Sequence, residues 1–147
     1  MKLIFRIVAP VLVIFIGIQW QLGRLNFARS PAGLSGNTCE GKNFCAMVYL
    51  APWCPHCQSA IPYTQEILAR SRGGDLGVRV VVGLGDPSQN MAMAQKIAMN
   101  VQLDNDKKIA SEMGIQGVPS YFVFDKEGTK ILEGMESLTW IMEKFQR

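Results

Sequence analysis

The sequence predicts an α/β fold with a mixed central sheet flanked by helices. Two buried strands with a helix between them are expected at the bulky apolar run 44–50 and the valine-rich run 78–82. Residues 125–128, Asp-Lys-Glu-Gly, are typical of a tight turn between two further strands, and an amphipathic helix over 138–145 closes the chain. This order of elements requires parallel and antiparallel neighbours in one sheet.

The remaining elements are bounded by capping and turn residues. Gly73 and Gly74 break the chain after the first helix. Asp86 and Pro87 are a suitable N-cap and first residue for the second, and Asp106 is expected to cap the third. In chain order, the expected elements are a helix over 54–70, a helix over 87–99, a short strand over 101–103, a helix through 113 stopped by Gly114, and strands over 120–124 and 130–133.

The chain is expected to divide into a membrane anchor (1–23), a linker (24–43) and one folded domain (44–147). Two basic residues precede the uncharged stretch 7–23, whose 17 residues reach roughly 25 Å as a helix, at the short end of what crosses a bilayer. The linker is rich in Gly, Ser, Asn and Pro. The layout favours a cytoplasmic N-terminus with the domain on the far side. A cleaved signal peptide and a cytosolic protein are the alternatives.

Net charge argues against a nucleic-acid partner. The chain carries 15 basic and 12 acidic residues, a net charge of +3. Without Lys2 and Arg6 the count is 13 against 12, which leaves +1 for the rest of the chain. No basic stripe interleaved with aromatic residues is present in the sequence.

The motif that carries chemistry is Trp53-Cys54-Pro55-His56-Cys57, which directly follows the first strand. It places Cys54 where a strand ends and a helix begins. Backbone N–H groups and the positive end of the helix dipole favour a thiolate there. Cys57 lies one turn further along, close enough to close a small disulfide with Cys54. The pattern predicts a dithiol for exchange.

Together with Gly117-Val118-Pro119 about sixty residues later and the hairpin after it, this motif resembles the thioredoxin superfamily. Pro62, eight residues after Cys54, matches the proline that kinks the active-site helix in that family. Pro119 matches the cis-proline that faces the dithiol and helps to bind the client's backbone. The resemblance implies a thioredoxin-like fold over the whole domain after the linker.

Two affinities within the superfamily disagree about the direction of electron flow. The anchor and the extra strand and helix over 77–100 are similar to membrane-tethered TlpA- or ResA-type proteins, which implies a reductant, for example in cytochrome c maturation. Pro55-His56 and Val118 are instead similar to the oxidase DsbA. We expect a single-pass protein of the bacterial inner membrane with its domain in the periplasm, favouring oxidation or isomerisation of client disulfides.

The resemblance also implies roles for individual residues. Cys54 is the nucleophile that forms a mixed disulfide with the client, and Cys57 resolves it. His56 supports the Cys54 thiolate, and Trp53 shields one side of the dithiol. The expected partners are client proteins with thiols or disulfides and a membrane redox partner. The residues expected to contact the client are Trp53, Pro55, Val118 and Pro119.

One position departs from the thioredoxin pattern. Thioredoxins carry a buried acid six residues before the first active-site cysteine, where this chain has Val48. That acid helps to deprotonate the resolving thiol. The resolving step therefore lacks this base unless Glu66, Tyr49 or water substitutes.

The other two cysteines do not complete a metal site with the dithiol. Along a strand, Cys45 and Cys54 lie roughly 20 Å apart, whereas ligands of one zinc ion lie within about 4 Å. We expect no metal and no cofactor. Cys39 and Cys45 either form a local disulfide, which suits an oxidising compartment, or remain two thiols. A non-catalytic binding module with a thioredoxin fold and a metal-handling protein are the alternative functions.

Overall fold

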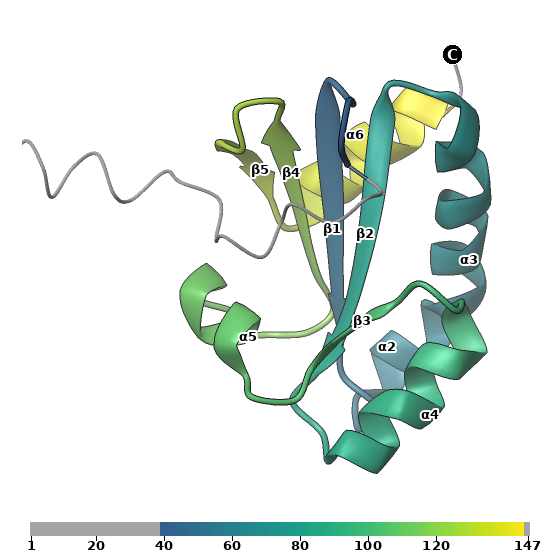
Figure 1. Ribbon diagram of the computed structural model, residues 1–147, viewed down its shortest axis with the longest axis vertical. Helices are drawn as coiled ribbons and strands as arrows, with labels where there is room; N and C mark the ends of the chain where they lie inside the picture. The colour runs from purple at the N-terminus through teal and green to yellow at the C-terminus, as the bar shows by residue number, and fades with distance from the viewer. Residues whose placement is uncertain (1–38, 146–147) are drawn as a thin grey trace, which may run out of the picture.

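Five strands form one mixed sheet at the centre of the computed structural model, which describes residues 39–145 (Figure 1). The strands are β1 (Phe44–Leu50), β2 (Leu76–Gly83), β3 (Gln102–Asp104), β4 (Ser120–Asp125) and β5 (Lys130–Glu133). Their order across the sheet is β3-β2-β1-β4-β5. β1, β2 and β3 run parallel, whereas β4 runs antiparallel to β1 and to β5. The expected α/β class with a mixed sheet is confirmed.

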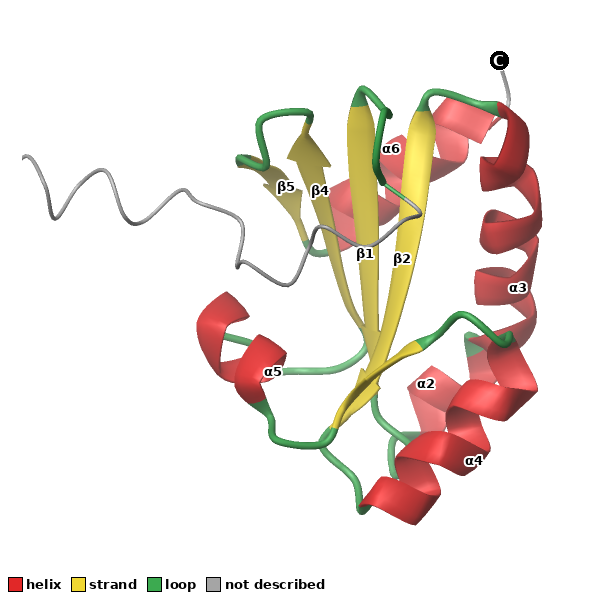
Figure 2. Cartoon of the chain, in the orientation of Figure 1, coloured by secondary structure: helices red, strands yellow, loops and turns green. Residues whose placement is uncertain are grey.

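The helices cover the two faces of the sheet unequally (Figure 2). The helices that pack on one face include α3, α4 and α6, whereas α5 packs on the other. The helical elements are α2 (Pro55–Ser59), α3 (Ile61–Arg70), the short 3-10 turn η1 (Ser71–Gly73), α4 (Pro87–Ile97), α5 (Lys108–Met113) and α6 (Met135–Phe145).

β1 is buried on both faces because it lies in the middle of the sheet. Its alternating side chains divide between the two halves of the core. Ala46, Val48 and Leu50 pack with the dithiol and with α3, α4 and α6. Met47 and Tyr49 pack on the opposite face with α5. Because β1 packs in both halves of the core, the segment that follows it and carries the dithiol has a fixed starting point.

Several expected boundaries are corrected by the structure. The single helix expected over 54–70 is interrupted at Ala60, because Pro62 has no N–H to donate to the preceding turn. α4 ends at Ile97 rather than at residue 99, since Ala98 is already extended (φ −170°). α6 starts three residues earlier than expected, directly after Gly134, whose φ of +74° turns the chain into the helix.

The expected cap of α5 is also corrected. Asp106 accepts only one hydrogen bond at the start of α5, from the Lys108 N–H at 3.3 Å. The buried carboxylate of Asp104, at the end of β3, accepts from the N–H groups of Ile109 at 3.0 Å and Ala110 at 2.9 Å. A residue of the preceding strand therefore fixes the start of α5.

The expectations for the membrane anchor (1–23) and for most of the linker (24–43) lie outside the described residues. Between residues 39 and 145, no helix combines the length and apolar character needed to span a membrane.

Candidate active site

The dithiol lies where β1 ends and α2 begins. Cys54 is the N-cap of α2, with extended backbone angles (φ −89°, ψ 119°), and Pro55 follows at the first helical turn. The Cys54 N–H donates to the Ala51 carbonyl at 3.2 Å, which closes a tight turn after the strand. The proline at the helix start costs no hydrogen bond, because the first helical N–H groups have no partner within the helix. The strand end thus fixes the first cysteine at the mouth of a short helix.

Cys54 and Cys57 are both free thiols in the structure, and only Cys54 has accessible surface. The Cys57 backbone N–H donates to the Cys54 sulfur at 3.4 Å. The Cys54 thiol in turn donates to the Val118 carbonyl at 3.4 Å. The exposed fractions are 4% for Cys54 and 0% for Cys57. A client sulfur therefore reaches Cys54 first.

The carbonyl that faces Cys54 comes from the loop between α5 and β4. The peptide bond between Val118 and Pro119 is cis, as the resemblance implies. This loop brings residues more than sixty positions away in the sequence against the dithiol. An open hollow of 570 Å³ lies beside the loop and is lined by Gly117, Val118, Pro119, Phe122 and Glu133, among others. The hollow lies along the loop that carries the cis-proline, and no residue of the dithiol segment lines it.

The environment of Cys57 favours the protonated form of its thiol. Burial raises the pKa of Cys57 to about 12; a hydrogen bond from the Ala51 backbone acts in the opposite direction, while the neighbouring Cys54 raises the pKa further. A thiol attacks a disulfide only as the thiolate. Cys57 is thus well placed to attack a mixed disulfide on Cys54 but needs a group that removes its proton.

Glu66, Tyr49 and water were the three groups expected to replace the missing acid, and the two side chains do not lie beside Cys57. Val48 packs in the same buried cluster as Cys57, which confirms that an apolar side chain occupies this part of the core. Tyr49 points to the opposite face, where its hydroxyl donates to Asp104 at 2.7 Å. Glu66 is exposed and pairs with Arg70 on α3. Neither Tyr49 nor Glu66 is a base for Cys57, which leaves water.

Two of the motif's side chains extend into solvent. His56 is exposed, and its imidazole forms no hydrogen bond to Cys54 in the described part of the chain. The donor that the structure does show at the Cys54 sulfur is the Cys57 N–H. Trp53 is 61% exposed, yet its indole N–H donates to the Leu84 carbonyl at 3.0 Å. The aromatic ring beside the nucleophile is therefore fixed at one edge.

Sequence reasoning missed the loop that holds Trp53. Leu84 has a positive φ of 63°, which is uncommon for a residue other than glycine. Gly85 follows, and a Cβ at that position would overlap the ring of Pro52. The Gly-Asp-Pro sequence after a buried strand was a signal for a tight turn, but it gave no indication that the turn contacts the dithiol segment.

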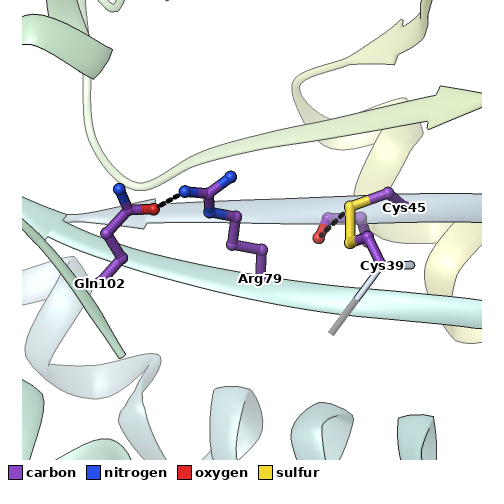
Figure 3. Close-up of a disulfide and its surroundings, with 5 residues drawn as sticks. Cys39, Cys45, Arg79 and Gln102 are labelled. Atoms are coloured by element: carbon purple, nitrogen blue, oxygen red, sulfur yellow. Dashed lines mark hydrogen bonds between the residues drawn. A yellow bond between two sulfur atoms is a disulfide. The ribbon is translucent and has the colours of Figure 1, made fainter. Parts of the chain in front are cut away.

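Cys39 and Cys45 form a disulfide (Figure 3). Of the two alternatives, a local disulfide or two thiols, the structure therefore has the disulfide. Arg79 lies nearby on β2 and is largely buried; its guanidinium turns away from the disulfide and donates to Gln102. Burial lowers the pKa of Arg79. In the part of the chain that the structure describes, no three His, Cys, Asp or Glu side chains are grouped as metal ligands would be.

A mixed sheet, a Cys-x-x-Cys pair at a strand-to-helix junction and a cis-proline facing it define the class: thioredoxin-like thiol-disulfide oxidoreductases. Residues 37–145 match the family model of the thioredoxin-like domain, and the chain belongs to that family. No curated protein matches the chain.

Solved structures with the same fold cover most of the chain at low sequence identity. A protein described as a thiol:disulfide interchange protein DsbE from Chlorobium tepidum is 20% identical, with a TM-score of 0.62, over 82% of this chain and 92% of that one. StoA from Bacillus subtilis is 18% identical, with a TM-score of 0.58, over 70% and 85%. A secreted disulfide oxidoreductase of Mycobacterium tuberculosis is 18% identical, with a TM-score of 0.56, over 82% and 97%.

Proposed function

We propose that this protein exchanges the Cys54–Cys57 disulfide with thiols of extracytoplasmic client proteins, and that it favours oxidation or isomerisation over reduction. The observation that carries the proposal is the asymmetry of the pair. Cys54 is 4% exposed, and its sulfur accepts a hydrogen bond from the Cys57 N–H, whereas the Cys57 thiol is completely buried. One sulfur meets the client, and the other acts only within the protein.

The steps balance in either direction. In oxidation, a client thiolate attacks Cys54 of the protein disulfide, and Cys57 leaves and takes up a proton. A second client thiolate then attacks the client sulfur of the mixed disulfide and releases Cys54. In reduction, the Cys54 thiolate attacks a client disulfide, and Cys57 must lose a proton before it displaces the client. Isomerisation needs only Cys54.

The proton requirement at Cys57 supports isomerisation over net reduction. Reduction ends with an attack by the Cys57 thiolate, which is scarce because burial raises the pKa of Cys57 to about 12. Mixed disulfides that resolve slowly leave time for other client thiols to attack, which is what isomerisation requires. Val48, in place of an acid, removes the group that would shorten this time.

The proposed location is the outer side of a bacterial inner membrane, with residues 1–23 as a single-pass anchor. The Cys39–Cys45 disulfide supports this location, because structural disulfides persist in oxidising compartments. A membrane redox partner would then return the dithiol to its working state. The second candidate is a membrane-tethered reductant of the TlpA or ResA type, which the N-terminal segment favours.

Exchange itself is tested with three full-length proteins. Wild type is expected to catalyse disulfide exchange in reduced ribonuclease or insulin, and Cys54→Ser is expected to abolish it. The double variant Cys39→Ser/Cys45→Ser is the matched control, since it removes two sulfurs without touching the dithiol, and it should retain the wild-type rate. A wild-type protein without exchange activity, together with partner association that survives replacement of both Cys54 and Cys57, would support the binding-module alternative.

The direction is tested by the reduction potential of the Cys54–Cys57 pair in a glutathione series. A value near about −120 mV supports the oxidase and one near about −270 mV the reductase. Clients are identified by trapping with Cys57→Ala, because Cys54 then keeps the client in a mixed disulfide.

A further inference from the structure

Asn90, one turn into α4, is completely buried although its side chain is polar. Its amide pairs with the backbone of Gly85 in both directions. The Gly85 N–H donates to Asn90 Oδ1 at 3.1 Å, and Asn90 Nδ2 donates to the Gly85 carbonyl at 3.2 Å. Nδ2 also donates to Asn105 Oδ1 at 2.9 Å. Every polar atom of the side chain is therefore engaged, and two of the three contacts hold the loop after β2.

This loop packs directly on the segment that leads into the dithiol. A Cβ on Gly85 would overlap the ring of Pro52, so only glycine allows the two to approach so closely. The Pro52 carbonyl is held from the other side by the Gln58 side chain at 2.8 Å. Asn90 thus fixes a surface against which the residue before Trp53 rests.

Leu84 turns the loop's carbonyl toward Trp53. Its positive φ of 63° is a conformation that costs free energy for a residue other than glycine and persists only where the surroundings impose it. The two hydrogen bonds between Asn90 and the backbone of Gly85, the next residue, are such a constraint. In this conformation the Leu84 carbonyl accepts a hydrogen bond from the Trp53 indole N–H at 3.0 Å.

We propose that Asn90 is a positioning residue that acts through Gly85 and the Leu84 carbonyl to hold the Trp53 ring beside Cys54. A ring that is 61% exposed and fixed at one edge presents a rigid apolar face to the client segment that flanks the reacting cysteine. Asn90 then governs selection of clients with apolar or aromatic residues next to the cysteine, and not the intrinsic reactivity of the sulfur. This inference rests on the proposed exchange function.

The test compares two disulfide substrates in a double-mutant cycle. Full-length proteins with Cys57→Ala carry Asn90→Ala, Trp53→Phe, both or neither. The rate constant for mixed-disulfide formation at Cys54 is measured with a peptide disulfide flanked by aromatic residues and with oxidised glutathione. Phenylalanine keeps an aromatic side chain but lacks the five-membered ring that carries the indole N–H.

Each single variant is expected to lower the rate with the peptide about fivefold, the effect of one lost hydrogen bond. The rate with glutathione should change less than twofold, because glutathione is too small to span the ring. In the Trp53→Phe background, Asn90→Ala should have less than a twofold further effect with the peptide. Non-additivity of this kind indicates a shared path.

Equal losses with both substrates, or independent losses that multiply, would overturn the inference and leave Asn90 a purely structural residue. Asn105→Ala keeps both contacts to Gly85 and should react as wild type does. Ile141→Val, in the core at α6, controls for lost stability. If Asn90→Ala fails to fold, Gly85→Ala carries the test, since its Cβ would overlap the Pro52 ring and press on Asn90 Oδ1, which shifts the loop without removing the Asn90 side chain. A protein without mixed-disulfide formation on either substrate refutes the proposed function instead.

Discussion

Val48 of β1 is the cross-strand partner of Tyr121 of β4, on the face of the sheet that packs against Cys57. The aliphatic side chain of Val48 thus stands where the thioredoxin pattern has a carboxylate, with an aromatic side chain beside it. Burial raises the pKa of Tyr121, and the charges of Cys57 and Tyr63 act in the same direction. Tyr121 therefore stays a neutral phenol. Neither Val48 nor Tyr121 can act as a base for the Cys57 thiol.

The first prediction concerns the pH dependence of resolution. Burial is the main cause of the raised pKa of Cys57, and we expect it to remain when Cys54 carries a client. The thiolate fraction of a group with a pKa of about 12 rises tenfold with each pH unit below that value. The rate at which Cys57 releases a client from Cys54 should therefore rise about tenfold per unit from pH 7 to 9. Rapid-quench analysis of a preformed mixed disulfide measures it, and a plateau below pH 9 would contradict the prediction.

The second prediction restores the missing acid. Val48→Asp should speed resolution at pH 7 by about tenfold or more, because a carboxylate beside Cys57 accepts its proton. It should also lower the free energy of unfolding by about 3 kcal/mol, the scale of burying an ionisable group in an apolar cluster. Val48→Asn has a similar volume and no charge. If it accelerates the step equally, the effect is one of packing or water access rather than of a base.

The third prediction concerns the Tyr49–Asp104 contact under α5. Burial alone raises the pKa of Asp104, but hydrogen bonds from Tyr49 and from the Ala110 and Ile109 N–H groups outweigh it and lower the pKa. Urea unfolding should show that Asp104→Asn costs about 2–3 kcal/mol and Tyr49→Phe about 1–2 kcal/mol at pH 7.

The sign of the pH effect at Asp104 follows from its lowered pKa. The carboxylate's contribution is complete above the unfolded-state value of about 3.9 and is lost as the pH falls through the lower folded-state value. The difference between wild type and Asp104→Asn should therefore shrink below about pH 4. Glu112→Gln, on the exposed side of α5, should change stability by less than about 0.5 kcal/mol. A constant difference down to pH 2 would show that Asp104 acts only through its shape.

The fourth prediction separates the two cysteine pairs. Cys39 and Cys45 are six positions apart, and closing so short a loop stabilises a protein by about 2 kcal/mol through the unfolded chain. The double serine variant should lose that amount in chemical unfolding. Its exchange rate at Cys54 should stay within twofold of wild type, because the pair lies at the opposite end of β1. A parallel loss of exchange would mean that the second disulfide takes part in the electron path.

Much of the fold follows from local patterns in the sequence. The apolar run of β1, the Asp-Pro start of α4 and the turn between β4 and β5 are each encoded within a few residues, so their types and approximate places were predictable. The boundaries that differed depend on neighbours in space. The start of α5 is fixed by Asp104, which is buried only because Tyr49 and α5 cover it.

The site shows the same division. Cys54 and Cys57 were predicted from their place at a strand-to-helix junction, and Pro119 from the resemblance to the thioredoxin superfamily. The structure has a cis bond before Pro119 and the Val118 carbonyl facing the Cys54 sulfur. The contact between Trp53 and Leu84 spans 31 residues and depends on a backbone conformation that leucine rarely adopts. No short pattern encodes such a contact. It becomes visible only when the loop and the dithiol segment lie side by side.

The complete burial of Cys57 also bears on damage by peroxide. An oxidant that enters from solvent meets Cys54 alone and converts its thiolate to a sulfenic acid. Cys57 lies close enough to condense with that group, which releases water and leaves an ordinary disulfide. The sheltered thiol thus turns an oxidative injury into the oxidised form in which the protein already works.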